Sequence, residues 1–163
     1  MKRILLSALS VFAFGFMVCH GQNQAALEAA KQDSPEQNPI DMKSFISLFE
    51  IPATNISRAI DFYQSILDIN IEKMEIPGSE LGVFPYEGQM VSVVIIQEEG
   101  NKPSADGVTV YLKGGDNLQN ILDKVEKYGG KIIVPKTAHA DESGFFALFL
   151  DTEGNKLGLD SPN

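Results

Sequence analysis

The spacing of apolar and polar residues predicts one strand–helix unit that occurs twice in the chain. Residues 45–52 (FISLFEIP) form an apolar run closed by proline, which is typical of a buried strand. After Asn55, apolar residues recur at helical spacing, so we expect an amphipathic helix that this asparagine caps. An offset of 62 matches this unit to a second one, as in these pairs: Ile56 with Leu118, Ile60 with Leu122, and Ile66 with Tyr128. Such a repeat predicts a pseudo-two-fold domain in which neither copy buries its apolar face alone.

Three further strands are predicted after each helix. They are expected at 69–76, 81–86 and 90–97 in the first half, and at 131–134, 145–150 and 156–159 in the second. We expect Asp116 to cap the second helix, and the polar segment 98–106 to link the halves. The predicted fold class is therefore α+β, with two βαβββ modules. The eight strands are expected to form one curved mixed sheet shaped as a cup, with one helix per module outside.

The first 43 residues have a different composition from the rest. Two basic residues precede the largely apolar run 4–18, which predicts a signal peptide over 1–21. Residues 22–43 have no apolar stripe and are interpreted as a flexible linker before a domain at 44–163. The alternative is a lipoprotein anchored at Cys19, the only cysteine of the chain.

The charge of the exported chain excludes two classes of partner. The sequence has 13 basic and 22 acidic residues, and removal of Lys2 and Arg3 leaves 11 basic residues and a formal charge of −11. We therefore expect no nucleic-acid partner and no membrane insertion after signal cleavage, since polyanions would repel the protein. Loss of Cys19 would also leave no thiol for a disulfide or for nucleophilic chemistry.

Three stretches resemble one protein family: FEIPATNISRAIDFYQSIL, VYLKGGDNLQNILDKVEKYGGKIIVPKT and GFFALFLDTEGNKLGL. They are similar to the vicinal oxygen chelate superfamily, which includes glyoxalase, extradiol dioxygenases and bleomycin- or fosfomycin-resistance proteins. The resemblance covers residues 44–161 and implies a cup in which His, Gln or Glu at four strand positions hold a divalent metal. Those positions fall on Leu48, on the strand Val108–Leu112, on Gly158, and on a strand whose only polar side chains are Ser92 and Gln97. We therefore expect neither a metal nor another cofactor.

The same correspondence gives the candidate ligand-binding residues. If Leu48 faces the cup, strand alternation places Ile46 and Glu50 on that face as well. The full candidate set is Ile46, Leu48, Glu50, Val108, Val110, Leu112 and Gly158. Glu50 is the candidate catalytic base, because a carboxylate among apolar neighbours has a raised pKa. The alternative places Glu50 in solvent at the strand end, or in a pair with Arg58 or a lysine.

His139 is the second candidate catalytic residue. It is the only histidine beyond the predicted signal peptide, and it stands in a polar loop with Asp141 and Glu142. In that setting it would shuttle protons near neutral pH; the alternative is a solvated loop histidine. Tyr111 is expected in the core, in the place that Phe49 takes in the first half.

Three hypotheses for function remain open. The first is an exported, metal-free protein that binds a small organic molecule in an apolar cup. The second is a metal-independent lyase or isomerase that uses Glu50 as its base, with help from His139. The third is a structural or interaction domain whose cup has collapsed. The cup is closed either within one chain or between the two chains of a homodimer.

Export makes a direct prediction about the N-terminus. Cleavage after Gly21 should give a mature protein that begins at Gln22 and lacks Cys19, because the signal peptide is removed at small residues. Intact-mass measurement of the exported protein checks this, and a diacylglyceryl group on Cys19 would establish the lipoprotein alternative instead.

Overall fold

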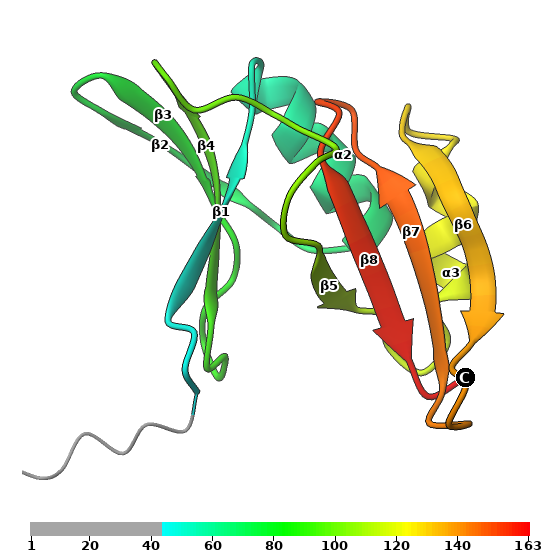
Figure 1. Ribbon diagram of the computed structural model, residues 1–163. Coiled ribbons are helices and arrows are strands. Elements are labelled where there is room, and N and C mark those ends of the chain that lie inside the picture. Colours follow the sequence, from blue (N-terminus) through cyan, green and yellow to red (C-terminus); the bar gives the residue numbers. More distant parts are fainter. Residues whose placement is uncertain (1–43) are drawn as a thin grey trace, which may run out of the picture. The chain divides into compact units, whose positions relative to one another are not determined.

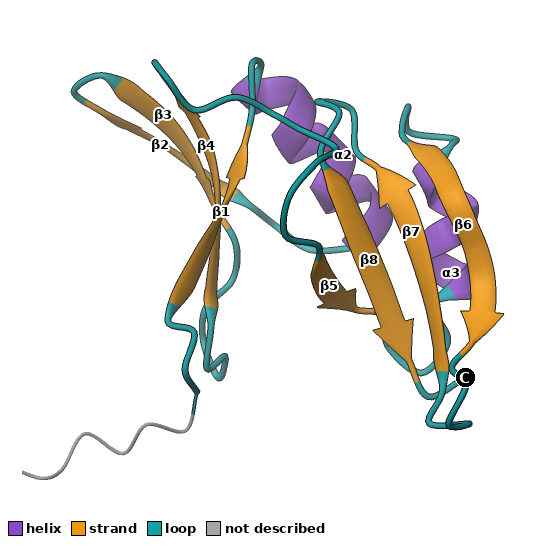
Figure 2. Ribbon diagram, viewed as in Figure 1, coloured by secondary structure: helices purple, strands orange, loops and turns teal. Residues whose placement is uncertain are grey.

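The computed structural model describes residues 44–163, so the predicted signal peptide and linker lie outside the described residues. The predicted α+β fold with two βαβββ modules is confirmed (Figures 1 and 2). The first module contains β1 (Leu48–Pro52), α2 (Ile56–Leu67), β2 (Glu72–Ile76), β3 (Ser79–Val83) and β4 (Ser92–Glu98). The second contains β5 (Val110–Lys113), α3 (Gln119–Val125), β6 (Lys131–Ala138), β7 (Phe145–Leu150) and β8 (Lys156–Ser161). No helix within 44–163 is long and apolar enough to cross a membrane.

The eight strands form two four-stranded sheets instead of one continuous sheet. Their orders are β1-β4-β3-β2 and β5-β8-β7-β6, so the two sheets have the same topology. In each sheet the first and last strands of the module pair in parallel, and the other neighbours are antiparallel. β1 and β2 are therefore the edge strands of the first sheet, and β5 and β6 are those of the second.

The helix α2 forms as its sequence predicts. The side-chain oxygen of Asn55 accepts a hydrogen bond from Arg58 N at 3.0 Å, which satisfies one of the free N–H groups of the first turn. Gln97 satisfies another, since its Oε1 accepts from Ile56 N at 2.8 Å. The predicted apolar stripe is buried: Ile56, Ala59, Ile60, Tyr63 and Ile66.

The second helix begins later than predicted. α3 starts at Gln119, and its N-cap residue is Leu118, which has no side chain able to cap it, so the predicted Asp116 cap is wrong. Instead, Leu118 N donates to Ser161 Oγ at 3.0 Å, and Asn117 Oδ1 accepts from Gln119 N at 3.0 Å. The end of β8 thus supplies a partner that the local sequence could not reveal.

β6 is longer than the predicted strand and runs on through Pro135. Its pairing with β7 shifts register between Ile132 and Val134 and again between Val134 and Thr137. A proline has no N–H to donate, so a strand accepts it where the regular ladder is interrupted. With these shifts, β6 extends to Ala138, whereas the predicted strand ended at residue 134.

One apolar core joins the two modules. Phe62 and Tyr63 of α2 meet edge to face with ring centroids 5.1 Å apart, and Phe62 lies 6.2 Å from Phe149 of β7. All three rings are buried in the same cluster, together with Leu122 of α3. As the repeat predicts, each module completes the burial of the other.

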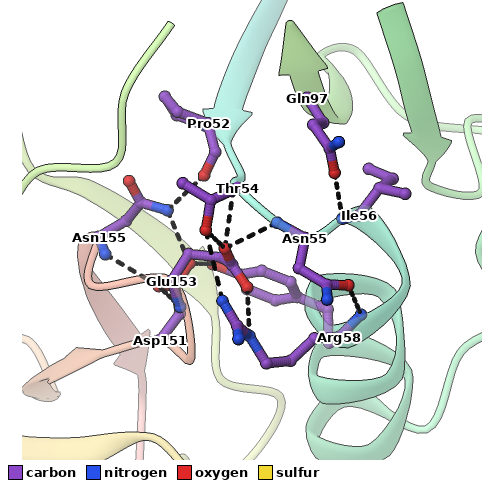
Figure 3. A network of polar contacts seen from close by, with 10 residues as sticks. Pro52, Thr54, Asn55, Ile56, Arg58, Gln97, Asp151, Glu153 and Asn155 are labelled. Atoms are coloured by element: carbon purple, nitrogen blue, oxygen red, sulfur yellow. Dashed lines mark hydrogen bonds and ion pairs between the residues drawn. The ribbon is translucent and has the colours of Figure 1, made fainter.

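A polar joint of five turn residues reinforces this core. The turn Asp151–Asn155 connects β7 to β8 and reaches the first module (Figure 3). Asn155 Nδ2 donates to the Pro52 carbonyl and to Asp151 Oδ2, both at 2.8 Å. Tyr63 donates its hydroxyl to Asp151 Oδ2 at 2.7 Å. Burial, followed by the nearby Asp151 charge, raises the pKa of Tyr63 well above its ordinary value.

Glu153 provides the strongest part of this polar joint. Its carboxylate accepts hydrogen bonds from Thr54 N and Thr54 Oγ1 at 2.8 Å, from Asn55 N at 3.1 Å, and from Arg58 Nε at 2.7 Å (Figure 3). The carboxylate thereby complements the positive N-terminal end of α2. Desolvation acts to raise the pKa of Glu153, but the hydrogen bonds from Arg58, Thr54 and Asn55 outweigh it and lower the pKa.

Glu153→Gln should therefore destabilise the domain by about 1–3 kcal/mol, since it weakens several charge-assisted hydrogen bonds of a fully buried side chain. Because folding lowers the pKa of Glu153, its contribution is present at neutral pH and is lost as the pH falls through the folded-state pKa. Urea unfolding at neutral and acidic pH checks both points. The matched control is Glu126→Gln, at an exposed position. Equal unfolding free energies for the two variants at neutral pH would contradict the role of Glu153.

Candidate functional site

Each sheet has one face toward the helices and one open face. In β1, Ile51 belongs to the buried core and Phe49 packs against it. Leu48 and Glu50, which alternate with them, lie on the open face and are exposed, as the sequence predicted. Ile46, just before β1, is exposed as well.

The second module departs from the prediction by one residue. Leu112 packs against the core and pairs with the buried Leu159, so our expectation that Leu112 faces the cup is wrong. Tyr111 takes the open face instead, with 47% of its surface exposed, so our placement of Tyr111 in the core is also wrong.

The reason is an extra residue in the second strand–helix connection. Ala53 N donates to the Ile96 carbonyl at 2.8 Å at the end of β1. At the end of β5, Gly114 N makes the equivalent bond to the Asp160 carbonyl at 2.7 Å. Position 53 therefore corresponds to position 114, an offset of 61, whereas the buried helix residues keep the offset of 62.

A cavity of about 240 Å³ lies beside Glu50. Val108 and Val110 line it too, so the structure brings together three of the seven residues predicted to bind ligand. Ile46, Leu48, Leu112 and Gly158 do not line this cavity. Residues of β1, β8 and the linker between the modules complete its wall.

The walls of this cavity are more polar than predicted. Lys102 and Asp106 of the linker and Lys156 of β8 line it together with Glu50. Asp106 is thus a second carboxylate in the site besides Glu50. Arg58, which the alternative interpretation offered as an ion-pair partner of Glu50, binds Glu153.

Gly158 lies buried beneath the ring of Tyr111. A Cβ atom at position 158 would stand 2.2 Å from Tyr111 Cδ1, closer than any two such carbons can approach. The ring therefore fills the space that a side chain at position 158 would need. With the strand offset of 61, Tyr111 is also the counterpart of Glu50.

The residues present do not fit the divalent metal that the resemblance implies. Leu48 has no donor atom, Gly158 has no side chain, and Gln97 uses its side-chain oxygen to cap α2. Among residues 44–163, no group of three or more His, Cys, Asp or Glu side chains is arranged to hold a metal ion. Such an ion needs several converging N or O donors.

His139 does not line the Glu50 cavity, and its hydrogen-bond partner lies outside its own loop. Its Nε2 lies 2.8 Å from Asp160 Oδ1, and its ring lies 5.2 Å from that of Phe146. Asp141 instead accepts a hydrogen bond from Ser143, which lowers the pKa of Asp141. His139 and Asp160 line a second cavity of about 280 Å³, together with Tyr111, Leu112 and Lys113.

The sequence contained a signal for some of the residues that we missed. Alternation along 156–160 places Lys156, Gly158 and Asp160 on one face of β8, so the Gly158 assignment already pointed to the other two. Lys102 and Asp106 had no such signal, because the local sequence of a linker does not show which part of the fold the linker will contact.

Comparison with protein families gives a match over most of the described chain. The family model described as Glyoxalase/Bleomycin resistance protein/Dioxygenase superfamily matches residues 45–159. A glyoxylase-like domain-containing protein of Didymella fabae is 30% identical over 120 residues, which cover 68% of this chain and 88% of that protein.

Solved structures share the fold at low sequence identity. An antibiotic binding protein of Streptomyces sp. CB03234 (TnmS3) is 20% identical, with a TM-score of 0.59, over 74% of this chain and 97% of that one. A glyoxalase I variant of Zea mays is 16% identical, with a TM-score of 0.57, over 71% of this chain. The match spans only 45% of the maize protein's length.

Proposed function

The chain belongs to the glyoxalase/bleomycin resistance protein/dioxygenase superfamily, and on that premise we propose that it binds a small organic molecule without a metal. The observation that carries the proposal is the cavity of about 240 Å³ beside Glu50. Ligand sites are typically concave and mainly apolar, with a few polar groups that fix orientation. Open space beside Glu50 favours this role over an interaction domain with a collapsed cup.

The wall of the cavity indicates an amphipathic ligand. Val108, Val110 and Phe49 offer apolar contacts, while the lysines and carboxylates beside them offer charge. A ligand with an apolar body and at least one charged or strongly polar group would satisfy both. The antibiotic binding protein of similar fold is a precedent for a role in binding.

The enzymatic alternative also rests on Glu50. Glu50 shares its cavity with Lys102 and Lys156. In a catalytic role the carboxylate would accept a proton, and the cationic groups would stabilise the negative charge then formed on a substrate. A metal-independent lyase or isomerase would use this arrangement. A glyoxalase I of Zea mays is among the proteins that share this fold.

Export to the periplasm or the medium is part of the proposal. It is supported by the charged and apolar N-terminal segment, which lies outside the described residues. Intact-mass measurement of the exported protein, which should begin at Gln22, tests this part of the proposal.

We also propose that a second copy of the chain covers the open face of the first sheet. Large apolar side chains are exposed on the first sheet, among them Leu48 (45%), Met74 (44%) and Ile76 (47%). Exposed apolar surface of this extent commonly marks an interface. Edge strands β1 and β5 also have free hydrogen-bonding edges within the described residues, which another chain can satisfy.

Glu50→Gln should abolish or strongly weaken ligand binding while the fold is kept, because Glu50 is an exposed wall residue and packs against no core element. The measurement is a thermal-shift screen of small amphipathic molecules on the wild type, with the hits repeated on the variant and on Glu126→Gln as control. Hits that survive Glu50→Gln would contradict a site at Glu50. A loss of roughly 3–5 kcal/mol of stability would identify Glu50 as one partner of a buried ion pair instead.

Purified protein should contain no stoichiometric metal, since the Tyr111 ring occupies the space of a donor at position 158. Elemental analysis after purification without chelators checks this. About one zinc, nickel, manganese or iron ion per chain would contradict the metal-free proposal.

Met74→Lys should weaken dimerisation by at least about tenfold, because a charge would be buried in an apolar contact. Sedimentation velocity over a concentration series measures the dissociation constant. Tyr128→Lys, at an exposed position just after α3, is the matched control. A wild-type protein that stays monomeric at high concentration would refute the dimer.

A further inference from the structure

We propose that Tyr111, His139 and Asp160 form a second ligand site, on the open face of the second module, for a planar aromatic molecule that carries a hydroxyl group. The cavity there has a volume of about 280 Å³ and shares no lining residue with the Glu50 cavity. The inference therefore goes beyond the proposed function and stands on separate residues.

The platform of this site is the Tyr111 ring. Tyr111 Cγ, Cδ1 and Cε1 would all lie within 2.7 Å of a Cβ at position 158, so the ring lies directly on the backbone of β8. Only glycine allows an aromatic ring to come this close to the backbone. The strand then supports one face of the Tyr111 ring. The side chain is nevertheless 47% exposed, which leaves aromatic surface free. A held, partly open ring is suited to offset stacking with another ring.

The polar part of this site is the His139–Asp160 pair. The carboxylate of Asp160 can only accept, so His139 Nε2 carries the proton of their 2.8 Å hydrogen bond. In the neutral imidazole, this leaves Nδ1 as an acceptor. Phe146, whose ring is 5.2 Å from that of His139, restricts the tilt of the imidazole. Asp160 therefore orients the imidazole so that its Nδ1 can accept a hydroxyl proton. A carboxylate orients the histidine base of catalytic groups in the same way.

Lys113 defines the ligand class further. It lines the same cavity and alternates with Tyr111 along β5, so both belong to the open face. An ammonium group favours a ligand whose hydroxyl oxygen takes on partial negative charge as its proton is shared with His139. Aromatic hydroxyls are more acidic than aliphatic ones, as the ordinary pKa of tyrosine near 10 shows. A hydroxyaromatic molecule thus satisfies the ring, the acceptor and the cation together.

The test is a titration of the full exported chain with 2-naphthol. Binding is monitored through the fluorescence of the ligand and through two-dimensional ¹⁵N–¹H NMR spectra of the protein. The largest shifts are expected at Tyr111, Lys113 and Gly158. Tyr111→Ala should weaken binding about 3- to 10-fold through lost stacking. Tyr86→Ala, at another exposed tyrosine, is the matched control and should leave the affinity unchanged.

Two related probes separate stacking from hydrogen bonding. 2-Methoxynaphthalene keeps the rings but has no proton to donate, so it should bind more weakly than 2-naphthol to the wild type. The difference between these two ligands should disappear in His139→Leu, whose side chain has no acceptor. The His139 Nδ1 nitrogen resonance should move with 2-naphthol alone, a response that a purely structural histidine would not show.

Three outcomes would overturn the inference. They are unchanged 2-naphthol affinity in Tyr111→Ala, shifts confined to Val108 and Val110 of the Glu50 cavity, and no binding by the folded wild type. Near-ultraviolet circular dichroism of each variant establishes that it is folded. Because Val108 and Val110 report on the Glu50 cavity, failure of one site is distinguishable from failure of the other.

Discussion

The buried carboxylate of Glu153 is the contact on which the arrangement of the two modules depends. It comes from the β7–β8 turn of the second module and satisfies N–H groups at the start of α2 in the first. Asn155 of the same turn binds the Pro52 carbonyl at the end of β1 and also lines the cavity beside Glu50. The turn therefore fixes the edge of the first sheet against the second, and with it the wall of the candidate site. If the hydrogen bonds of this turn were broken, the shape of the cavity would change even though its lining side chains stayed the same.

A single extra residue makes the two modules chemically different. The strands correspond with an offset of 61 and the helices with an offset of 62, so the counterpart of Glu50 is Tyr111. One module thus presents a carboxylate on its open face, and the other presents an aromatic ring seated on Gly158. The ring occupies the space in which a side-chain donor would have stood. The Tyr111 ring therefore leaves no room for a side-chain donor at position 158 and supplies an aromatic surface in its place.

The fold could be predicted from the sequence because its signals are local. The apolar spacing of α2, its Asn55 cap and the repeated element order all depend on residues close together in the chain. The same local rule placed Leu48 and Glu50 correctly on one face of β1. It failed at Tyr111 and Leu112, because an apolar residue occupies both positions and alternation alone does not say which one faces the helices. The hydrogen bond of His139 to Asp160 had no local signal either, since Asp160 is distant in sequence.

The sequence by itself determined the family, the two βαβββ modules and the identity of the buried helix faces. These follow from periodicity and from the side chains that must leave water. The tertiary structure decided the register of β5, the turn that joins the modules, and the linker residues Lys102 and Asp106 beside Glu50. Those features depend on hydrogen bonds and contacts between residues far apart in the chain, such as Thr54 with Glu153. Only the folded backbone brings such partners within reach, so no local pattern in the sequence records them.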